Sequence, residues 1–247
     1  EYGEALNTIR DGVSLAVEAR MRSEHFRTEL ITNVSHDIKT PLTSIINYVD
    51  LLDKEKPENE KMREYIDVLQ RQSARLKKLI DDLLEASKAS TGNLNVNAEP
   101  CNVGVLLDQS LGEYGEKLSA AGLEPVLTKP EKPVIIMADG RHMWRIFDNL
   151  LNNICKYSMR GTRVYLEVCE QDGKALVTFR NISSHQLNIS SEELMERFVR
   201  GDSSRNTEGS GLGLNIAQSL ARLQNGELSL TIDGDLFKVT LIFETIK

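Results

Sequence analysis

A histidine beside an aspartate, within helical spacing, is the first group in this sequence that could do chemistry. His36 precedes Asp37 and lies off the apolar stripe that includes Val34 and Ile38, so its imidazole is expected to face solvent. Imidazole titrates near neutral pH and can act as an acid, a base or a nucleophile. Thr40 lies four residues further along and projects from nearly the same helical face. Because most surface histidines are inert, this pair alone decides nothing.

An asparagine-rich segment in a helical pattern is the second candidate. Asn149 and Asn153 are spaced i, i+4 and are expected on one helix face, with Asn152 between them. Asparagine is a poor helix former because its amide competes for backbone hydrogen bonds, so this density requires a reason. One reason is amide oxygens offered to magnesium, with Lys156 about one turn further reaching a phosphate. A solvated polar face that ends in a cap explains the same residues, and both interpretations stay open here.

A glycine cluster is the third candidate, and its chemistry would be phosphate binding. Glycines occupy alternate positions before a helical pattern: Gly209, Gly211 and Gly213. They allow close backbone approach to a ligand, and the N terminus of the following helix offers N–H groups to phosphate. The spacing matches neither the dinucleotide-binding fingerprint nor the P-loop. The preceding residues, 198–208, are typical of a mobile lid, from which Arg200 and Arg205 can meet phosphate or simply face solvent.

Two long amphipathic helices are expected to carry the histidine. Their apolar stripes lie on either side of a polar stretch, Asp53–Lys61, that predicts a connecting loop. The first stripe comprises Ile31, Val34, Ile38, Leu42, Ile45, Val49 and Leu52. The second has strict heptad spacing and comprises Met62, Ile66, Leu69, Ser73, Leu76, Ile80 and Leu83. A lone antiparallel hairpin has little core, so dimerisation into a four-helix bundle is predicted.

The second half of the chain has a different pattern, beginning after a polar segment, Ser87–Asn97, that predicts a domain boundary. Helical and strand-like patterns alternate there, which favours an α/β sandwich with helices on one side of a sheet. Helices are expected over residues 102–121, 141–156, 191–198 and 211–223. Strands are expected over residues 123–128, 134–137, 164–169, 176–181, 227–232 and 237–243. The predicted fold class is therefore α followed by α/β.

The composition is that of an ordinary globular chain. The 247 residues are 40% apolar and 27% charged, which argues against wholesale disorder and suits one large domain or two ordinary ones. The net charge of −7 disfavours a general nucleic-acid binder. No apolar run approaches the ~20 residues that span a bilayer. The three cysteines, Cys101, Cys155 and Cys169, are widely spaced, so reduced thiols are expected rather than zinc ligands or disulfides.

Taken in order, these signals resemble the catalytic half of a bacterial two-component sensor histidine kinase. Residues 35–42 (SHDIKTPL) are similar to the histidine box of that family, and residues 149–157 (NLLNNICKY) to its asparagine box. Residues 196–198 (ERF) resemble its phenylalanine box, and residues 209–214 (GSGLGL) its second glycine box. The resemblance covers residues 23–243, and four boxes in this order are highly specific.

The resemblance implies a domain organisation and a set of partners. Residues 1–22 would be a signalling connector helix, residues 23–90 the dimerisation and histidine-phosphotransfer domain, and residues 94–247 an ATP-binding domain of the type shared with gyrase. The partners implied are a second copy of the chain and the receiver domain of a response regulator. No nucleic acid and no direct membrane contact of this fragment are expected. The fragment would be the cytoplasmic portion of a membrane-anchored sensor.

The resemblance also implies roles for individual residues. His36 would accept the γ-phosphoryl group of ATP, and Asp37 would orient its ring and assist proton removal. Thr40 would orient the water that attacks a phospho-aspartate, so phosphatase activity towards the regulator is also expected. The residues expected to bind ATP are Asn149, Asn153, Lys156, Tyr157, Asn181, Arg200, Arg205, Gly209, Gly211, Leu212 and Gly213. Asn149 and Asn153 would also contact Mg²⁺, directly or through water.

One segment departs from the family pattern. Where the first glycine box usually has an aspartate that reads the adenine amino group, followed by Gly-x-Gly, residues 179–184 are FRNISS. Asn181 thus replaces the carboxylate, and both glycines are absent. A neutral acceptor contributes ~0.5–1.5 kcal/mol against ~1.5–3 for a charged one, so weaker or less discriminating adenine recognition is expected.

Two other functions are compatible with the same residues. One is a dimerising scaffold that binds a receiver domain, with or without nucleotide, and has no catalytic activity. The other is an ATPase that uses hydrolysis for conformational switching. Phosphorylation of His36 distinguishes the kinase from both.

Overall fold

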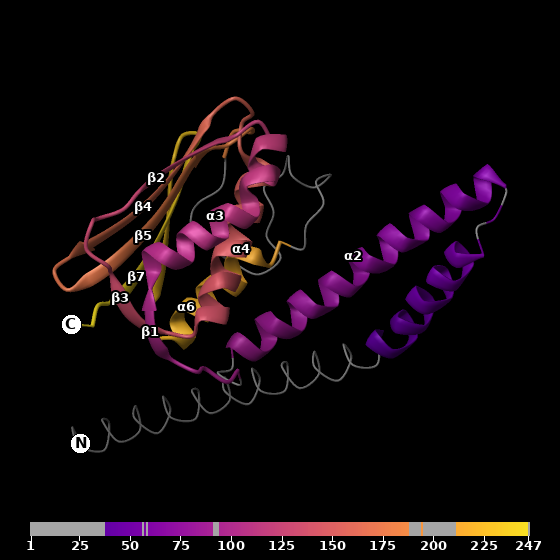
Figure 1. Ribbon diagram of the computed structural model, residues 1–247, viewed down its shortest axis with the longest axis horizontal. Coiled ribbons are helices and arrows are strands. Elements are labelled where there is room, and N and C mark those ends of the chain that lie inside the picture. The colour runs from indigo at the N-terminus through magenta and orange to yellow at the C-terminus, as the bar shows by residue number, and fades with distance from the viewer. Residues whose placement is uncertain are drawn as a thin grey trace, which may run out of the picture. The chain divides into compact units, whose positions relative to one another are not determined.

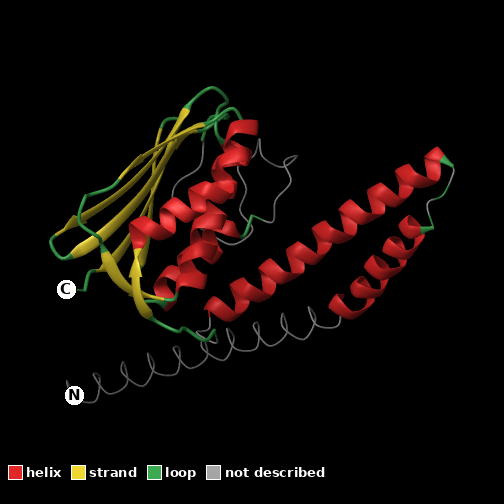
Figure 2. Ribbon diagram, viewed as in Figure 1, coloured by secondary structure: helices red, strands yellow, loops and turns green. Residues whose placement is uncertain are grey.

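The computed structural model describes residues 38–55, 57, 59–90, 94–187, 194 and 211–246. The chain divides into two compact units, Glu1–Asn93 and Leu94–Lys247. The described part of the first is helical, and that of the second combines helices with strands, as the sequence predicts (Figures 1 and 2). Among the described helices, none has the length and apolar character needed to cross a membrane.

The first unit contains an antiparallel helical hairpin (Figure 1). Residues 38–54 are helical, and the second helix is α2 (Glu60–Ser90). The connection between them, residues 55–59, is therefore shorter than the predicted loop, because helical structure extends into the polar stretch from both sides. An ion pair joins the two helices, with Lys39 Nζ 3.0 Å from Asp81 Oδ1.

Apart from Leu83, which is half-buried, the described residues of the two apolar stripes divide into a buried row and an exposed row. We call the buried set the inner row: Leu42, Val49, Ile66, Ser73 and Ile80. We call the exposed set the outer row, whose members are between 41 and 51% exposed: Ile38, Ile45, Leu52, Met62, Leu69 and Leu76. Within each helix, the members of one row recur every seven residues. Within a single chain, therefore, only one of the two rows of apolar heptad positions is buried.

The second unit is built on a five-stranded sheet with the strand order β2-β4-β5-β7-β6. The strands are β2 (Glu124–Thr128), β4 (Arg163–Gln171), β5 (Lys174–Ile182), β7 (Leu236–Glu244) and β6 (Glu227–Asp233). β2 runs parallel to β4, and the remaining neighbours are antiparallel. One face of the sheet is covered by helices (Figure 2): α3 (Val103–Ala120), α4 (Gly140–Tyr157) and α6 (Gly213–Leu223). This confirms the predicted α/β fold class.

A small second sheet was not predicted. It pairs β1 (Glu99–Asn102) with β3 (Ile135–Ala138) in antiparallel register. β1 has only four residues and contains Pro100, so it lacks both alternation and β propensity, and proline is tolerated because the strand lies at an edge. Apart from Leu194, which is helical, the predicted helix over residues 191–198 lies outside the described residues.

Helix α4 occupies the centre of the second unit, in contact with α3 and with α6. Its apolar face is buried, and the ring of Phe147 lies 5.6 Å from that of Phe179 on β5. Burial of one α4 face leaves the other positions of the same helix to form polar contacts with its neighbours.

Candidate functional site

Asn149 lies on α4 in a fixed orientation. Its side chain is 7% exposed, and its Nδ2 donates a hydrogen bond to the carbonyl oxygen of Arg145, one turn earlier, at 2.9 Å. The other end of the amide, Oδ1, points towards α6, because a Cβ atom at Gly213 would lie 3.2 Å from it. A solvated polar face therefore does not describe Asn149.

Asn153 directs its oxygen towards the same place. A Cβ atom at Gly213 would lie 3.7 Å from Asn153 Oδ1, so two carbonyl oxygens spaced i, i+4 face the first residue of α6. The structure thus brings Asn149, Asn153 and Gly213 together, and a Cβ atom at Gly213 would require the Asn149 amide to move by a few tenths of an ångström. Gly211, two residues earlier, has φ of +71°, a conformation that favours glycine.

The last turn of α4 meets the end of β5. The amide of Ser184 donates to the carbonyl oxygen of Tyr157 at 2.8 Å, and the amide of Met159 donates to that of Ile182 at 2.8 Å. Asn181, the last buried residue of β5, lies next to Ile182. The predicted residues Tyr157 and Asn181 are therefore at the same end of this unit.

Buried polar atoms without a partner occur near these elements. Among the described residues, none forms a hydrogen bond with Asn181 Oδ1, Ser158 Oγ or Asn215 Oδ1. Buried polar groups in folded proteins almost always have partners, so these atoms are candidates for contact with a ligand. Sequence analysis missed Ser158 and Asn215. The one available signal was their position, since Ser158 directly follows the asparagine-rich segment and Asn215 the glycine cluster.

The other predicted residues have varied placements. Thr40 is exposed on the first hairpin helix, Lys156 is half-buried on α4, and Leu212 is buried just before α6. The remaining ones lie outside the described residues: His36, Asp37, Arg200, Arg205 and Gly209.

A cluster on the α3 side of α4 holds this helix in place. The buried hydroxyl of Tyr114 donates to Asp148 Oδ1, and Arg145 pairs with Asp148 Oδ2 at 3.0 Å. Burial and the Asp148 carboxylate raise the pKa of Tyr114 far above its usual range, so it remains a neutral donor. Burial also raises the pKa of Cys155, which favours its thiol form. The face opposite the α6 contact is thus structural.

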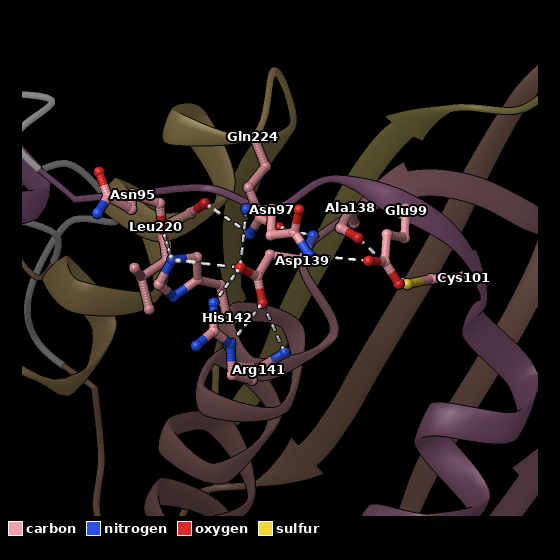
Figure 3. Close-up of polar contacts among 10 residues, drawn as sticks. All are labelled: Asn95, Asn97, Glu99, Cys101, Ala138, Asp139, Arg141, His142, Leu220 and Gln224. Atoms are coloured by element: carbon pink, nitrogen blue, oxygen red, sulfur yellow. Dashed lines mark hydrogen bonds and ion pairs between the residues drawn. The ribbon is translucent and has the colours of Figure 1, made fainter.

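The N terminus of α4 is anchored by a buried carboxylate (Figure 3). Asp139 caps the helix by accepting from the amide of Arg141 at 2.9 Å, and it also accepts from the Arg141 guanidinium. The amide of Asn97, in the segment that precedes β1, donates to Asp139 Oδ2 at 3.0 Å. These hydrogen bonds, led by that from the Arg141 side chain, hold the pKa of Asp139 far below its ordinary value.

The same anchor reaches α6 and the segment before β1 (Figure 3). The backbone amide of Asp139 donates to Gln224 Oε1 at 2.7 Å, and Gln224 Nε2 donates to the carbonyl oxygen of Leu220 at 2.9 Å. His142 Nε2 lies 3.0 Å from the carbonyl oxygen of Asn95. Asp139 therefore connects Asn97 with both helices, α4 and α6, that contribute the asparagine and glycine positions, and His142 of α4 contacts Asn95.

Comparison with known proteins gives two domain matches. Residues 26–92 match the model of the His Kinase A (phospho-acceptor) domain. Residues 138–245 match the model of the histidine kinase-, DNA gyrase B- and HSP90-like ATPase family. Together the two matches cover more than half of the chain.

Two curated relatives align with nearly the whole chain. The sensor protein VanSC of Enterococcus gallinarum is 31% identical over 231 residues, which is 92% of this chain and 63% of the relative. The sensor protein kinase WalK of Staphylococcus aureus is 27% identical over 240 residues, which is 94% of this chain and 57% of the relative. The chain thus spans about three-fifths of the length of each.

Solved structures agree on the fold. Full-length ShkA in complex with AMPPNP superposes with a TM-score of 0.74 at 21% identity, covering 88% of this chain and 46% of ShkA. The Acinetobacter baumannii histidine kinase AdeS superposes with a TM-score of 0.61 at 17% identity, covering 86% of this chain and 98% of AdeS. With the two domain matches and the sequence relatives, the conclusion is that the chain belongs to the two-component sensor histidine kinases and contains their phospho-acceptor and ATPase domains.

Proposed function

We propose that the chain transfers the γ-phosphoryl group of Mg-ATP to His36 and then to an aspartate of a response-regulator receiver domain. A ring nitrogen of His36 attacks the γ-phosphorus, the bond to the β–γ bridging oxygen breaks, and ADP leaves. Asp37 orients the ring and takes up its proton. Because such a transfer needs positioning and charge neutralisation above all, the quality of the nucleotide site decides the rate.

The observation that carries this proposal is the fixed amide of Asn149. Its Nδ2 donates a hydrogen bond to the Arg145 carbonyl oxygen. This bond fixes the orientation of the amide, with the oxygen facing Gly213. Asn153 presents a second oxygen to the same point, and neutral oxygens of this kind suit a hard divalent cation that keeps its waters and phosphate ligands. Bound magnesium would neutralise phosphate charge there, while Lys156 holds a phosphate and Asn181 receives the base.

Dimerisation belongs to the same proposal. The outer row leaves six large apolar side chains exposed at heptad spacing, and a second hairpin with the same row would cover them. The resulting four-helix bundle carries two copies of His36. Thr40, exposed four residues after His36, would orient water for dephosphorylation of the regulator.

The test is transfer of label from γ-³²P-ATP to the purified chain in the presence of Mg²⁺. An acid-labile, alkali-stable phosphoprotein is expected, and His36→Gln should abolish it because no other side chain is expected to accept the group. His25→Gln is the matched control and should retain the label.

Other results would identify a different function. Hydrolysis of ATP without any phosphoprotein would indicate the switching ATPase. A dimer that neither forms a phosphoprotein nor hydrolyses ATP would indicate the scaffold. Label that persists in His36→Gln would contradict His36 as the acceptor.

A further inference from the structure

Asn181 is a polar residue at the end of an apolar row. Alternate residues of β5 are buried, in the order Ala175, Val177, Phe179 and Asn181. Phe179 contacts Phe147 of α4, so this row lies on the face of the sheet that the helices cover. Asn181 continues that face two residues further, at 4% exposure. An amide at such a position needs hydrogen-bond partners.

The amide of Asn181 lacks such a partner for its oxygen. No donor to Asn181 Oδ1 is present in the described part of the chain, and Ser158 Oγ is likewise buried without a partner. Ser158 forms a bridge with Ser183, two residues beyond Asn181, so the two polar atoms come from neighbouring elements at one end of the unit. Because both of these buried atoms lack a partner, a ligand that binds here is expected to present polar groups to them.

The chemistry of an amide differs from that of a carboxylate in one decisive respect. A carboxylate only accepts hydrogen bonds, whereas an amide accepts through oxygen and donates through nitrogen. Rotation of the Asn181 amide by half a turn exchanges these two ends. An amide can therefore pair with an amino group or with an oxo group at the same point of a ligand.

From this we infer that Asn181 allows the site to bind purine nucleoside triphosphates with either an amino or an oxo group at position 6. The site would then bind 6-oxopurine nucleotides as well as ATP. This rests on the proposed function, in which Asn181 faces that edge of the base. With adenine, the Asn181 oxygen accepts from the 6-amino group. With a 6-oxopurine in the same orientation, the Asn181 nitrogen donates to the oxygen.

The test compares the affinities of the chain for Mg-ATP and for Mg-ITP, because inosine has the 6-oxo group without the 2-amino group of guanine. We expect the wild-type affinities to lie within about tenfold of each other. Asn181→Asp should weaken ITP relative to ATP by at least about tenfold, since an acceptor would then face an oxo group. Asn225→Asp, in the exposed turn after α6, introduces the same charge and should leave the ratio unchanged.

A second substitution guards against loss of folding in Asn181→Asp. Asn181→Leu removes both the donor and the acceptor at similar volume, so it should weaken ATP and ITP by similar factors, with folding checked by thermal denaturation. Weakening of ATP alone would contradict the inference. A wild-type preference for ATP above about a hundredfold would also overturn it and leave the proposed function intact. Binding of neither nucleotide would overturn the proposed function itself.

Discussion

At the scale of single residues, the contact between α4 and the start of α6 is a closely packed position in the ATPase unit. Gly213 faces Asn149 Oδ1 and Asn153 Oδ1, and no side chain fits there without displacing an amide. Gly213 does not have a left-handed φ. The preference for glycine at this position therefore comes from the neighbouring asparagine side chains and not from the backbone conformation.

We predict that Gly213→Ala weakens Mg-ATP binding by about tenfold or more, because the Cβ atom, 3.2 Å from Asn149 Oδ1, shifts the amide out of position. The free energy of unfolding should stay the same or rise, since alanine is the better helix former by ~0.5–1 kcal/mol. Gly115→Ala in α3, where a Cβ atom meets nothing within 4 Å, is the control and should raise stability without changing affinity. Isothermal titration and urea unfolding measure the two quantities; equal affinity losses in both variants would contradict the prediction.

A second residue-scale prediction concerns Thr40. Thr40→Ala should leave the rate of autophosphorylation within about twofold, because an exposed hydroxyl one turn from the acceptor contributes little to attack on ATP. Dephosphorylation of the phosphorylated regulator should fall by about 100-fold, the usual scale for loss of a group that positions a reactant. Thr43→Ala, which loses only a hydrogen bond to its own helix, is the control. Equal losses of both activities in Thr40→Ala would exclude the assigned role.

Sequence spacing predicted that Asn149 and Asn153 share a helix face, because the i, i+4 relation is fixed by helix geometry. It did not predict Asn149's burial, since that depends on how α6 packs, or which end of its amide bonds to the Arg145 carbonyl of the same helix. The unpaired hydroxyl of Ser158 was equally beyond a sequence argument, because it arises where α4 and β5 meet.

At the scale of elements, Asp139 links three segments that are far apart in the sequence. It caps α4, accepts from Asn97 ahead of β1, and donates through its backbone to Gln224 at the end of α6. Because one carboxylate serves several donors, its charge state bears on all of them.

We predict that Asp139→Asn lowers the free energy of unfolding at pH 7 by about 2 kcal/mol, the scale of a hydrogen bond to a charged group. The pKa of Asp139 is depressed in the folded protein from its ordinary value of 3.8, so its stabilisation is present above that value and is lost as pH falls towards the folded pKa. The difference between wild type and variant should therefore shrink below about pH 4.

Urea unfolding at several pH values tests this prediction. Asp172→Asn, in an exposed turn with φ of 53° that asparagine tolerates, is the control and should change stability little at any pH. A difference between wild type and Asp139→Asn that stays constant from pH 7 to pH 3 would show that the charge does not contribute.

Most elements of the ATPase unit were predictable because their patterns are local. Alternation predicted β4, β5, β6 and β7, and helical periodicity predicted α3 and α4, with ends shifted by at most two residues. β1 was missed because it exists through pairing with β3, and a four-residue strand with a proline has no pattern of its own. The N-cap role of Asp139 had a sequence signal, an aspartate just ahead of a helical pattern, whereas the partner Gln224 had none.

At the scale of the whole molecule, the hairpin is incomplete as a single chain. The inner row is buried, but the outer row exposes apolar side chains at a spacing that only another helix of the same repeat can match. The heptad pattern was visible in the sequence. Which of its positions are left exposed was not, because that depends on how the two helices turn towards each other.

We predict that Leu69→Lys in the outer row raises the dimer dissociation constant by at least about 100-fold, because each dimer loses two buried leucines worth ~1.5–3 kcal/mol each. Val68→Lys changes an equally exposed apolar residue that belongs to neither row, and it should have little effect. Sedimentation equilibrium measures both. Equal weakening by the two variants would mean that the outer row does not form the interface.

The hydrogen bonds of Asp139 also determine how far the ATPase unit can be truncated at its N terminus without loss of stability in acid. A truncation that begins at Glu99, the first residue of β1, would remove the Asn97 amide that donates to Asp139 and the Asn95 carbonyl beside His142. With one donor fewer, the carboxyl would protonate at higher pH, so the shortened unit would lose stability in milder acid than one that begins at Leu94. The five residues 94–98, which form neither helix nor strand, thus contribute to the acid tolerance of the unit.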